Sequence, residues 1–433
     1  MTVSAVADTE SLNQQGGLKA WLVCLSAGLF FLYEFFQLNL FDTINSELQI
    51  TFQIDAVKLG WMSSSYLLAD ILFLLPAGIL LDRFSPRNVI LTALGICIIG
   101  TLGFALTNSY WLAFFFHFLS GIGNAFCFLS CVMLISRWFP PKRQALIVGL
   151  VVTMAFIGGM LAHTPFAKLN EMYGWRNALL IDAVLGVVIL CCIYWIVEDS
   201  PEGSAHKHST NSENWLAGFK SAVNNPQNWL AGLYTSFLNL PIMVFGALWG
   251  SNYLMRVFAL DKMTASTITA NILLGSIFGC PLAGWLSDRS GARKPIMILG
   301  AVISLLLVIP LYLGTDLSAL QLHALFFLLG VTTSTQVISY PLVAESNPAK
   351  YTGVATGLAS VLIMGGAGVA QMIFSAMLEF SARQSSSLNL LEHTTLQYSA
   401  ADYQKAALIF PIAFILALIA VLMVRETYCK RST

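Results

Sequence analysis

Hydrophobic residues fall in twelve long runs along the chain, separated by segments that carry charged and turn-forming residues. A helix needs about 20 apolar residues to cross the hydrocarbon core of a bilayer, and each run is close to that length or longer. The pattern therefore predicts an all-α membrane protein with twelve transmembrane helices. The predicted spans are residues 18–44, 57–81, 89–106, 110–136, 144–168, 177–197, 227–257, 263–286, 295–314, 319–345, 352–380 and 403–424.

Two polar stretches divide these runs. One falls between the sixth and seventh spans and is rich in Ser, Asn and His, which is typical of a linker; the other, near 381–402, joins the last two spans. The first 17 residues carry no Lys or Arg, so a retained first helix is expected rather than a cleaved signal peptide. The predicted organisation is a tail at 1–17, a six-helix bundle at 18–197, the linker at 198–226, a second six-helix bundle at 227–424 and a tail at 425–433.

Composition favours the same class of protein. Of the 433 residues, 57% are hydrophobic and 10% are charged, whereas a soluble domain has about 25% charged residues. These values argue against a cytosolic enzyme and a secreted disulfide scaffold, and a net charge of zero without a basic stripe argues against a nucleic-acid partner. Seven of the eight cysteines lie in apolar runs, and no His or Cys set has zinc-ligand spacing. Neither a metal nor a cofactor is therefore expected.

The loop charges predict the orientation in the membrane. If both termini lie on one side, that side receives 15 Lys and Arg residues and the other side receives 7. Cytoplasmic loops carry the excess of these residues. Both termini are thus predicted to be cytoplasmic, in a multi-pass protein of a bacterial inner membrane.

A ten-residue motif occurs twice. Residues 78–87 and 284–293 both fit the pattern G-x-L-x-D-R-x-x-x-R, 206 residues apart, and each copy follows the second span of a six-span half. The carboxylates and guanidinium groups could bond helix ends and one another. We expect a conformational latch that holds the two halves together on the terminal side, although the arginines could serve only as topological anchors. The predicted latch residues are Asp82, Arg83, Arg87, Asp288, Arg289 and Arg293.

The doubled motif resembles that of major facilitator superfamily transporters, as do residues 137–141 (Arg-Trp-Phe-Pro-Pro) and 173–176 (Tyr-Gly-Trp-Arg). The resemblance implies two pseudo-symmetric six-helix bundles and transport by alternating access. Residues 31–37 and 66–70 are also similar to bacterial phagosomal nutrient transporters, several of which take up amino acids. The Gly/Pro pattern of drug exporters is absent from the fifth span, which favours uptake over export.

Few ionisable residues lie inside the predicted spans, where such groups usually mark function. Glu34 and Asp70 are predicted to couple proton movement to transport, because neither has a Lys or Arg at its depth and a buried carboxyl favours its protonated form. The resemblance implies that the sixth span lies outside the cavity, so Asp182 is expected to be structural and to pair with Arg176. His163 could be functional, but a packing role is the stronger expectation.

The remaining polar residues of the spans are candidates for substrate contact. The predicted substrate-binding residues are Glu34, Gln37, His117, Asn124, Asn239, Asn271, Gln336 and Tyr340. Because the fixed charges are acidic, the cargo is expected to be neutral, cationic or zwitterionic, and an amino acid fits. A nucleoside, a sugar, a siderophore or a drug-like compound stays open, and so does export.

Partners other than the solute are expected to be protons and the lipid bilayer, and the protein is expected to act as a monomer. A nutrient sensor with a transporter-like fold is the alternative from another class, although the linker is too short to hold a folded signalling domain. An enzyme is not expected, because the histidines inside the spans are isolated from one another.

Overall fold

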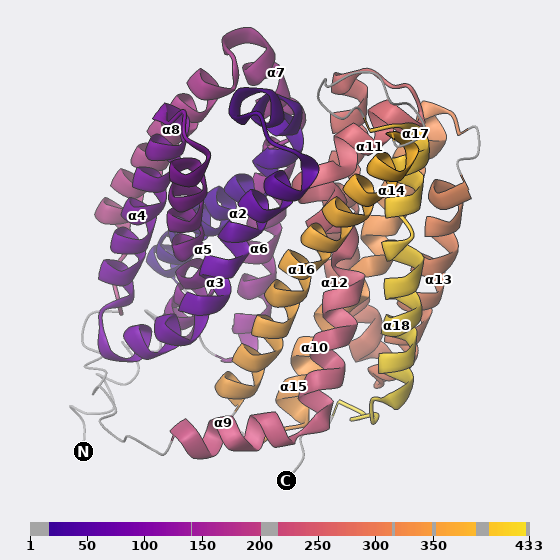
Figure 1. Cartoon of the computed structure of the whole chain (residues 1–433). Helices are drawn as coiled ribbons and strands as arrows, with labels where there is room; N and C mark the ends of the chain where they lie inside the picture. The colour runs from indigo at the N-terminus through magenta and orange to yellow at the C-terminus, as the bar shows by residue number, and fades with distance from the viewer. Residues whose placement is uncertain are drawn as a thin grey trace, which may run out of the picture.

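The computed structural model describes residues 17–139, 141–200, 215–313, 317–348, 352–386 and 398–429. All regular structure in these ranges is helical, and twelve single helices or runs of two or three consecutive helices are long and apolar enough to cross a membrane. The predicted all-α class and the twelve spans are confirmed. Figure 1 shows two bundles side by side, the N-terminal half in indigo to magenta and the C-terminal half in pink to yellow, with both chain ends at the same side.

Each half contributes six spans. In the N-terminal half these are α2 (Leu18–Phe52), α3 (Ala56–Arg83), α4 (Pro86–Leu106), α5 (Tyr110–Trp138), α6 (Pro141–Leu161) with α7 (Thr164–Tyr173), and α8 (Trp175–Ile196). In the C-terminal half they are α10 (Pro226–Leu238) with the π-helix η1 (Pro241–Trp249) and α11 (Gly250–Val257), α12 (Lys262–Ser290), α13 (Lys294–Leu313), α14 (Ala319–Thr333) with the 3-10 helix η2 (Ser334–Ile338) and α15 (Ser339–Glu345), α16 (Thr352–Ser386), and α17 (Ala400–Ala406) with α18 (Ile409–Met423).

Two boundaries differ from the sequence prediction in ways that matter for function. The first span was expected to end at residue 44, but α2 continues to Phe52. Its additional turns carry Asn45 and Glu47, whose side chains bond groups of the other half instead of entering a solvated loop. The second difference is a short helix, α9 (Trp215–Asn224), within the predicted linker; it lies across the lower end of the molecule in Figure 1.

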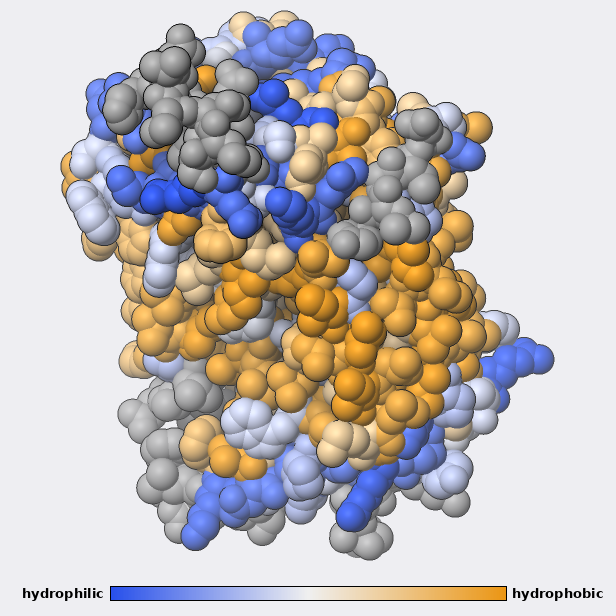
Figure 2. Space-filling model, turned by 45° about the vertical axis from the view of Figure 1, so that its right-hand side comes forward, coloured by the Kyte–Doolittle hydropathy of each residue, from blue (hydrophilic) through white to orange (hydrophobic). Residues whose placement is uncertain are grey.

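The surface fits a bilayer. In Figure 2 hydrophobic side chains form a broad band between two polar ends. Large apolar side chains such as Trp111, Val188 and Ile419 are exposed along the outside of the spans, which would be costly in water but is favourable against lipid. A multi-pass membrane protein is therefore the class that the structure supports.

Glycines allow the same helix pair to pack closely in both halves. A Cβ at Gly121 of α5 would clash with the backbone oxygen of Tyr66 in α3, and a Cβ at Gly330 of α14 would clash with that of Ile272 in α12. These are spans four and two of one half and spans ten and eight of the other. Small residues let membrane helices approach until their backbones touch, so the equivalent packing supports the relation between the two halves.

We expect Gly330→Ala to lower the free energy of unfolding by about 1–3 kcal/mol, because the added methyl group overpacks the α12–α14 contact. Gly149→Ala is the matched control, since a Cβ there meets nothing within 4 Å. Thermal unfolding of both variants in detergent measures the difference. Equal midpoints for the two variants would contradict the packing argument.

Candidate substrate and proton site

The two halves are joined on the side opposite the termini. Asn45 Nδ2 donates to Leu248 O at 2.7 Å, Thr164 and Thr267 share a hydrogen bond of 2.8 Å, and the Ala56 N–H donates to Tyr398 Oη at 2.8 Å. Nearer the middle of the membrane, two serines of α3 bond α16 of the other half. The Ser63 hydroxyl donates to Gln371 Oε1, and the Ser64 hydroxyl donates to Gly368 O. The structure thus represents a state that is closed away from the termini.

Glu34 lies inside the N-terminal half rather than between the halves. Its carboxylate accepts a hydrogen bond of 2.5 Å from Tyr66 Oη on α3. The second oxygen, Oε1, is buried without a hydrogen-bond partner and would lie against a Cβ placed on Gly123 of α5. In this conformation the Glu34 carboxylate is therefore enclosed within its own half and does not face the interface between the halves.

The side chain of Gln37 also points away from the interface between the halves, and it bonds the buried carboxylate of Asp182. The amide of Gln37 donates a short hydrogen bond to Asp182 Oδ2 on α8, and Tyr33 Oη lies 3.4 Å from the same oxygen. Arg176 bonds the backbone oxygens of Ala105 and Thr107 instead. The expected pairing of Asp182 with Arg176 is therefore wrong, because the arginine satisfies carbonyl groups at the end of α4.

Asp70 is the buried carboxylate that approaches both halves. It lies on α3 and is 2% exposed, with Oδ2 lacking a hydrogen-bond partner. Asn124 of α5, in the same half, lies within hydrogen-bonding reach of the Asp70 carboxylate. Tyr340 of α15, in the other half, is within electrostatic reach of Asp70 and within hydrogen-bonding reach of Ser360. The structure thus brings together three of the predicted site residues, Asp70, Asn124 and Tyr340.

The other predicted contacts are spread more widely. His117 stacks on Phe41 with ring centroids 4.2 Å apart, inside the N-terminal half. Asn271 points at the outer part of α14, where its Nδ2 lies 2.6 Å from His323 Nδ1. Asn239 and Gln336 are both buried: Asn239 follows the end of α10 in span seven, and Gln336 lies inside the 3-10 helix of span ten.

In the C-terminal half, the irregular segment of span ten packs against α10, the regular helix that precedes the π-helix of span seven. Pro241 begins the π-helix η1, and the polar run from Thr332 to Gln336 ends in the 3-10 helix η2. Thr235 Oγ1 donates to Gln336 O at 3.0 Å, and Tyr234 and Thr335 share a hydrogen bond of 2.9 Å. Broken helices of this kind are frequent at functional sites in transporters, because they expose backbone groups.

The described spans hold no buried Lys or Arg side chain. Arg293 is the one Lys or Arg that is buried in the described part of the chain, and it lies in the loop between α12 and α13. The carboxylates of Glu34, Asp70 and Asp182 therefore have no buried cation beside them in the membrane, as the sequence indicated for the first two.

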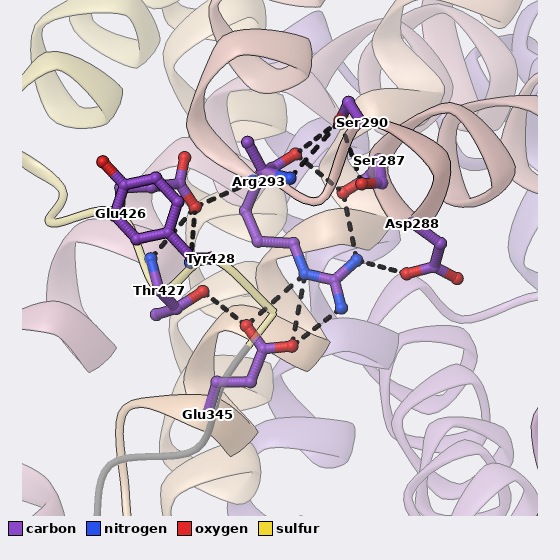
Figure 3. A network of polar contacts seen from close by, with 9 residues as sticks. Ser287, Asp288, Ser290, Arg293, Glu345, Glu426, Thr427 and Tyr428 are labelled. Carbon is purple, nitrogen blue, oxygen red and sulfur yellow. Dashed lines mark hydrogen bonds and ion pairs between the residues drawn. The ribbon is translucent and has the colours of Figure 1, made fainter.

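The second copy of the repeated motif forms a polar network within the C-terminal half (Figure 3). Arg293 bonds Glu345 Oε1 of α15 at 2.7 Å and Asp288 Oδ1 at 2.6 Å. The carboxylate of Glu426, after the last span, accepts from the backbone N–H groups of Arg293 and Lys294. Burial raises the pKa of Glu426, but these backbone donors lower it below its ordinary value, so the group is ionised at neutral pH and holds the start of α13.

The first copy repeats this arrangement. Asp199, after the sixth span, accepts from the backbone N–H of Arg87 at 2.9 Å, and Arg87 Nη2 donates to Tyr194 O. Arg289 lies over the ring of Trp285 on the surface. The side chains of Asp82 and Arg83 lie outside the described part of the chain. The described contacts of Arg87 and Arg293 thus stay within one half, and a latch across the halves remains a prediction for another conformation.

A buried polar cluster was missed by the sequence prediction. Asp42 of α2 accepts hydrogen bonds from the backbone N–H and the hydroxyl of Ser251 on α11, and His163 lies beside it. Asp42 sits two residues before the predicted end of the first span, where a charged side chain usually faces water. Three polar residues within the four positions from Asp42 to Asn45, interrupted only by Ile44, were the available signal.

The family model described as Major Facilitator Superfamily matches residues 23–371. The chain belongs to this superfamily. The gallate transporter of Pseudomonas putida is 23% identical over 342 residues, which cover 72% of this chain and 74% of that protein. The solved structure of the D-xylose-proton symporter has a TM-score of 0.74 at 17% identity and covers 95% of this chain and 99% of its own.

A bacterial homologue of the human lysosomal transporter Spinster, solved in an inward-facing and unoccupied conformation, is similar at a TM-score of 0.75 and 17% identity, over 94% of this chain and 98% of its own. These matches confirm the predicted major facilitator fold. The narrower resemblance to phagosomal nutrient transporters stays a prediction.

Proposed function

We propose that this superfamily transporter carries out proton-coupled uptake of a small polar nutrient across a bacterial inner membrane, with both termini in the cytoplasm. The observation that carries the proposal is Asp70. It is a buried carboxylate with an unpartnered oxygen, within hydrogen-bonding reach of Asn124 in its own half and close enough to Tyr340 of the other half for their charges to interact.

A carboxyl in this position can link protonation to alternating access. Burying an ionised carboxylate without a partner is costly, whereas a protonated one is tolerated. Asp70 would take up a proton when it faces the outside, allow the halves to close, and release the proton to the cytoplasm. Glu34, sealed in the same half behind Tyr66, is the second proposed proton site.

The cargo is proposed to be neutral, cationic or zwitterionic, with an amino acid as the best fit. Asp70 could meet an ammonium group, and the irregular backbone of spans seven and ten could meet a carboxylate or hydroxyl groups. A multiply charged anion would find no buried cation in the described spans to replace its hydration.

Uptake into proteoliposomes tests this function directly. An acidic exterior should drive accumulation of the substrate, and an uncoupler that collapses the pH gradient should abolish the accumulation but not exchange. Uptake that ignores the gradient would contradict proton coupling while leaving transport itself intact.

Ligand screening tests the cargo class. We expect amino acids or other zwitterions to raise the thermal stability of the purified protein and phosphate esters or dicarboxylates to leave it unchanged. A ligand at 100 times its Kd stabilises the folded state by about 2.7 kcal/mol. A saturable shift with a phosphate ester, competed by the transported solute, would overturn the proposed cargo class.

A further inference from the structure

We propose that the apolar groove between α3 and α16 binds one diacyl phospholipid, with an acyl chain in the groove and the phosphate at Lys58 and Arg383, at the end opposite the termini. The groove opens toward the bilayer and not toward the path of the solute. The inference therefore does not depend on the cargo, on proton coupling or on the direction of transport.

The groove lies where the two bundles meet on their outer surface. Helices α3 and α16 run side by side there (Figure 1). A cavity of about 350 Å³ opens between them, and its lining consists of six apolar side chains: Val57, Trp61, Val369, Met372, Ile373 and Ala376. Trp61 is 51% exposed and Val369 is 49% exposed, so the cavity is a surface groove and not an internal void.

The face of α16 that lines the groove points away from the protein interior. Gln371 marks the inner face, because its amide donates to Met243 O of η1 at 2.7 Å. At about 100° per residue, the four lining residues of α16 lie about 100–200° around the helix from Gln371. On α3, Trp61 lies about 200° from Ser63, which bonds Gln371 on the inner side. The groove therefore faces lipid.

Small residues hold the two helices together beside the groove. A Cβ at Gly60 of α3 would clash with the side chain of Ser375 on α16, and the Ser64 hydroxyl donates to Gly368 O at 3.1 Å. Small residues let membrane helices approach closely. The groove is thus bounded by a tight contact between two helices and not by loops.

Charged side chains gather at the end of the groove opposite the termini. Lys58 is exposed and lies three residues before Trp61 on α3. Arg383 follows Ala376 by seven residues, or about two turns, and so continues the same face of α16. Asp55, which caps α3, is within electrostatic reach of Arg383. The ends of both helices therefore bring basic groups to the same part of the groove.

The acidic groups at this end are already bonded, whereas the basic groups can still donate. Asp55 Oδ1 accepts from the Lys58 backbone N–H at 2.8 Å. Glu379 accepts from Arg383 Nε at 2.9 Å and from Tyr398 Oη at 2.8 Å. The contact with Glu379 uses only Nε of the guanidinium, which has five N–H donors, and the Arg383 side chain is 66% exposed. An anionic group such as a lipid phosphate complements this end.

The phosphate has to provide the selectivity of the site. Lipid tails are as apolar as the groove, so a chain that moves from the bilayer into the groove gains little free energy from burial alone. Hydrogen bonds from Arg or Lys to a phosphate are stronger than neutral ones. We therefore expect a phospholipid to be held in preference to a diacyl lipid with an uncharged sugar headgroup.

Quenching of tryptophan fluorescence by brominated lipids measures occupancy of the groove. The protein is placed in nanodiscs of an uncharged diacyl glycolipid that contain a rising fraction of phospholipid brominated along its acyl chains. The difference between the protein and Trp61→Phe gives the signal of Trp61. Trp111 of α5, which is 74% exposed, gives the reference for freely exchanging lipid through Trp111→Phe. Quenching of Trp61 should saturate at a low phospholipid fraction, and quenching of Trp111 should follow the fraction throughout.

Variants separate the charged end from the groove. Lys58→Gln should raise the half-saturating phospholipid fraction about fivefold, the factor that one basic residue contributes near a membrane surface. Ala376→Phe fills the groove and should remove the saturable quenching. Lys168→Gln in α7 and Ala324→Phe in α14 are the matched controls, because both residues are exposed and lie outside the groove; they should leave the curve unchanged.

Three results would overturn the site. Quenching of Trp61 and Trp111 in equal proportion to the phospholipid fraction would show lipid that only surrounds the protein. The same saturation with a brominated glycolipid would show a bound chain without recognition of phosphate. A Lys58→Gln curve identical to that of the wild type would contradict the phosphate contact, and this variant stays informative if Ala376→Phe fails to fold. Neither solute nor a pH gradient is present, so a failure of proton-coupled uptake leaves this test unaffected.

Discussion

Asp70→Asn is expected to abolish proton-driven accumulation of the substrate while leaving its exchange across the membrane largely intact. The amide imitates the protonated carboxyl, so the halves can still close around the site, but no proton is bound or released in a cycle. A gradient of one pH unit supplies about 1.4 kcal/mol per proton and can sustain about a tenfold accumulation. In the variant, the ratio of internal to external substrate should fall to about one, and counterflow should continue.

Two other buried carboxylates serve as comparisons for this result. Glu34→Gln tests the second proposed proton site, and Asp182→Asn tests a carboxylate that bonds Gln37 within one half. Asp182→Asn should retain accumulation. If Glu34→Gln loses accumulation and Asp70→Asn keeps it, the coupling site lies at Glu34, and the proximity of Asp70 to Tyr340 is incidental.

A direct role of Asp70 in binding gives a different outcome. If its carboxylate holds the ammonium group of a solute, Asp70→Asn should abolish exchange together with accumulation. Counterflow and pH-driven uptake measured on one preparation separate the two roles. Tyr340→Phe, which keeps the ring but removes the hydroxyl near Asp70, should weaken substrate binding in either case.

The spans and the two related halves could be predicted from the sequence because their signal is strong and local. Runs of apolar residues indicate the membrane-spanning helices, and the two copies of the motif at 78–87 and 284–293 indicate that the two halves are related. The end of the first span could not be predicted in the same way. The polar residues after position 41 are typical of a loop, whereas in the structure Asp42 and Asn45 are buried and bond α11 and η1 of the opposite half.

The direction in which individual side chains point could not be predicted from the sequence either. α2 is buried on nearly all sides, so its sequence has no polar face that would show which way Glu34 or Gln37 points. Glu34 meets Tyr66 and Gln37 meets Asp182, both inside one half. Asp70, Asn124 and Tyr340 were all predicted as candidates, but only the structure shows that Asp70 lies within reach of the other two.

The repeated motif is a case in which the sequence indicated the residues but not their partners. Arg293 and Arg87 are equivalent in the two copies, and each bonds groups of its own half. The carboxylates of Asp199 and Glu426, which the motif does not contain, complete both networks. We infer that in this conformation the networks stiffen each half, so that the halves move as rigid bodies.

Arg293→Gln is expected to destabilise the C-terminal half strongly. Arg293 is 7% exposed, and its partner Glu345 has a side chain that is 14% exposed. Removing the guanidinium leaves the Glu345 carboxylate with Thr427 as its remaining partner in Figure 3. Breaking a buried ion pair from one side costs about 3–5 kcal/mol, and the partial exposure of Glu345 places the expected loss toward the lower value.

Thermal unfolding of a small set of variants tests this expectation. The double variant Arg293→Gln, Glu345→Gln should recover part of the lost stability, since it removes the orphaned charge. Asp288→Asn is the matched control: its side chain is 71% exposed, and an exposed ion pair contributes about 0–1 kcal/mol. If Asp288→Asn lowers the unfolding midpoint as much as Arg293→Gln does, the stiffening role of the Arg293–Glu345 pair is wrong. If Asp288→Asn keeps both stability and ligand binding but loses transport, the carboxylate acts in a conformation in which the halves close on the terminal side, as the latch prediction requires.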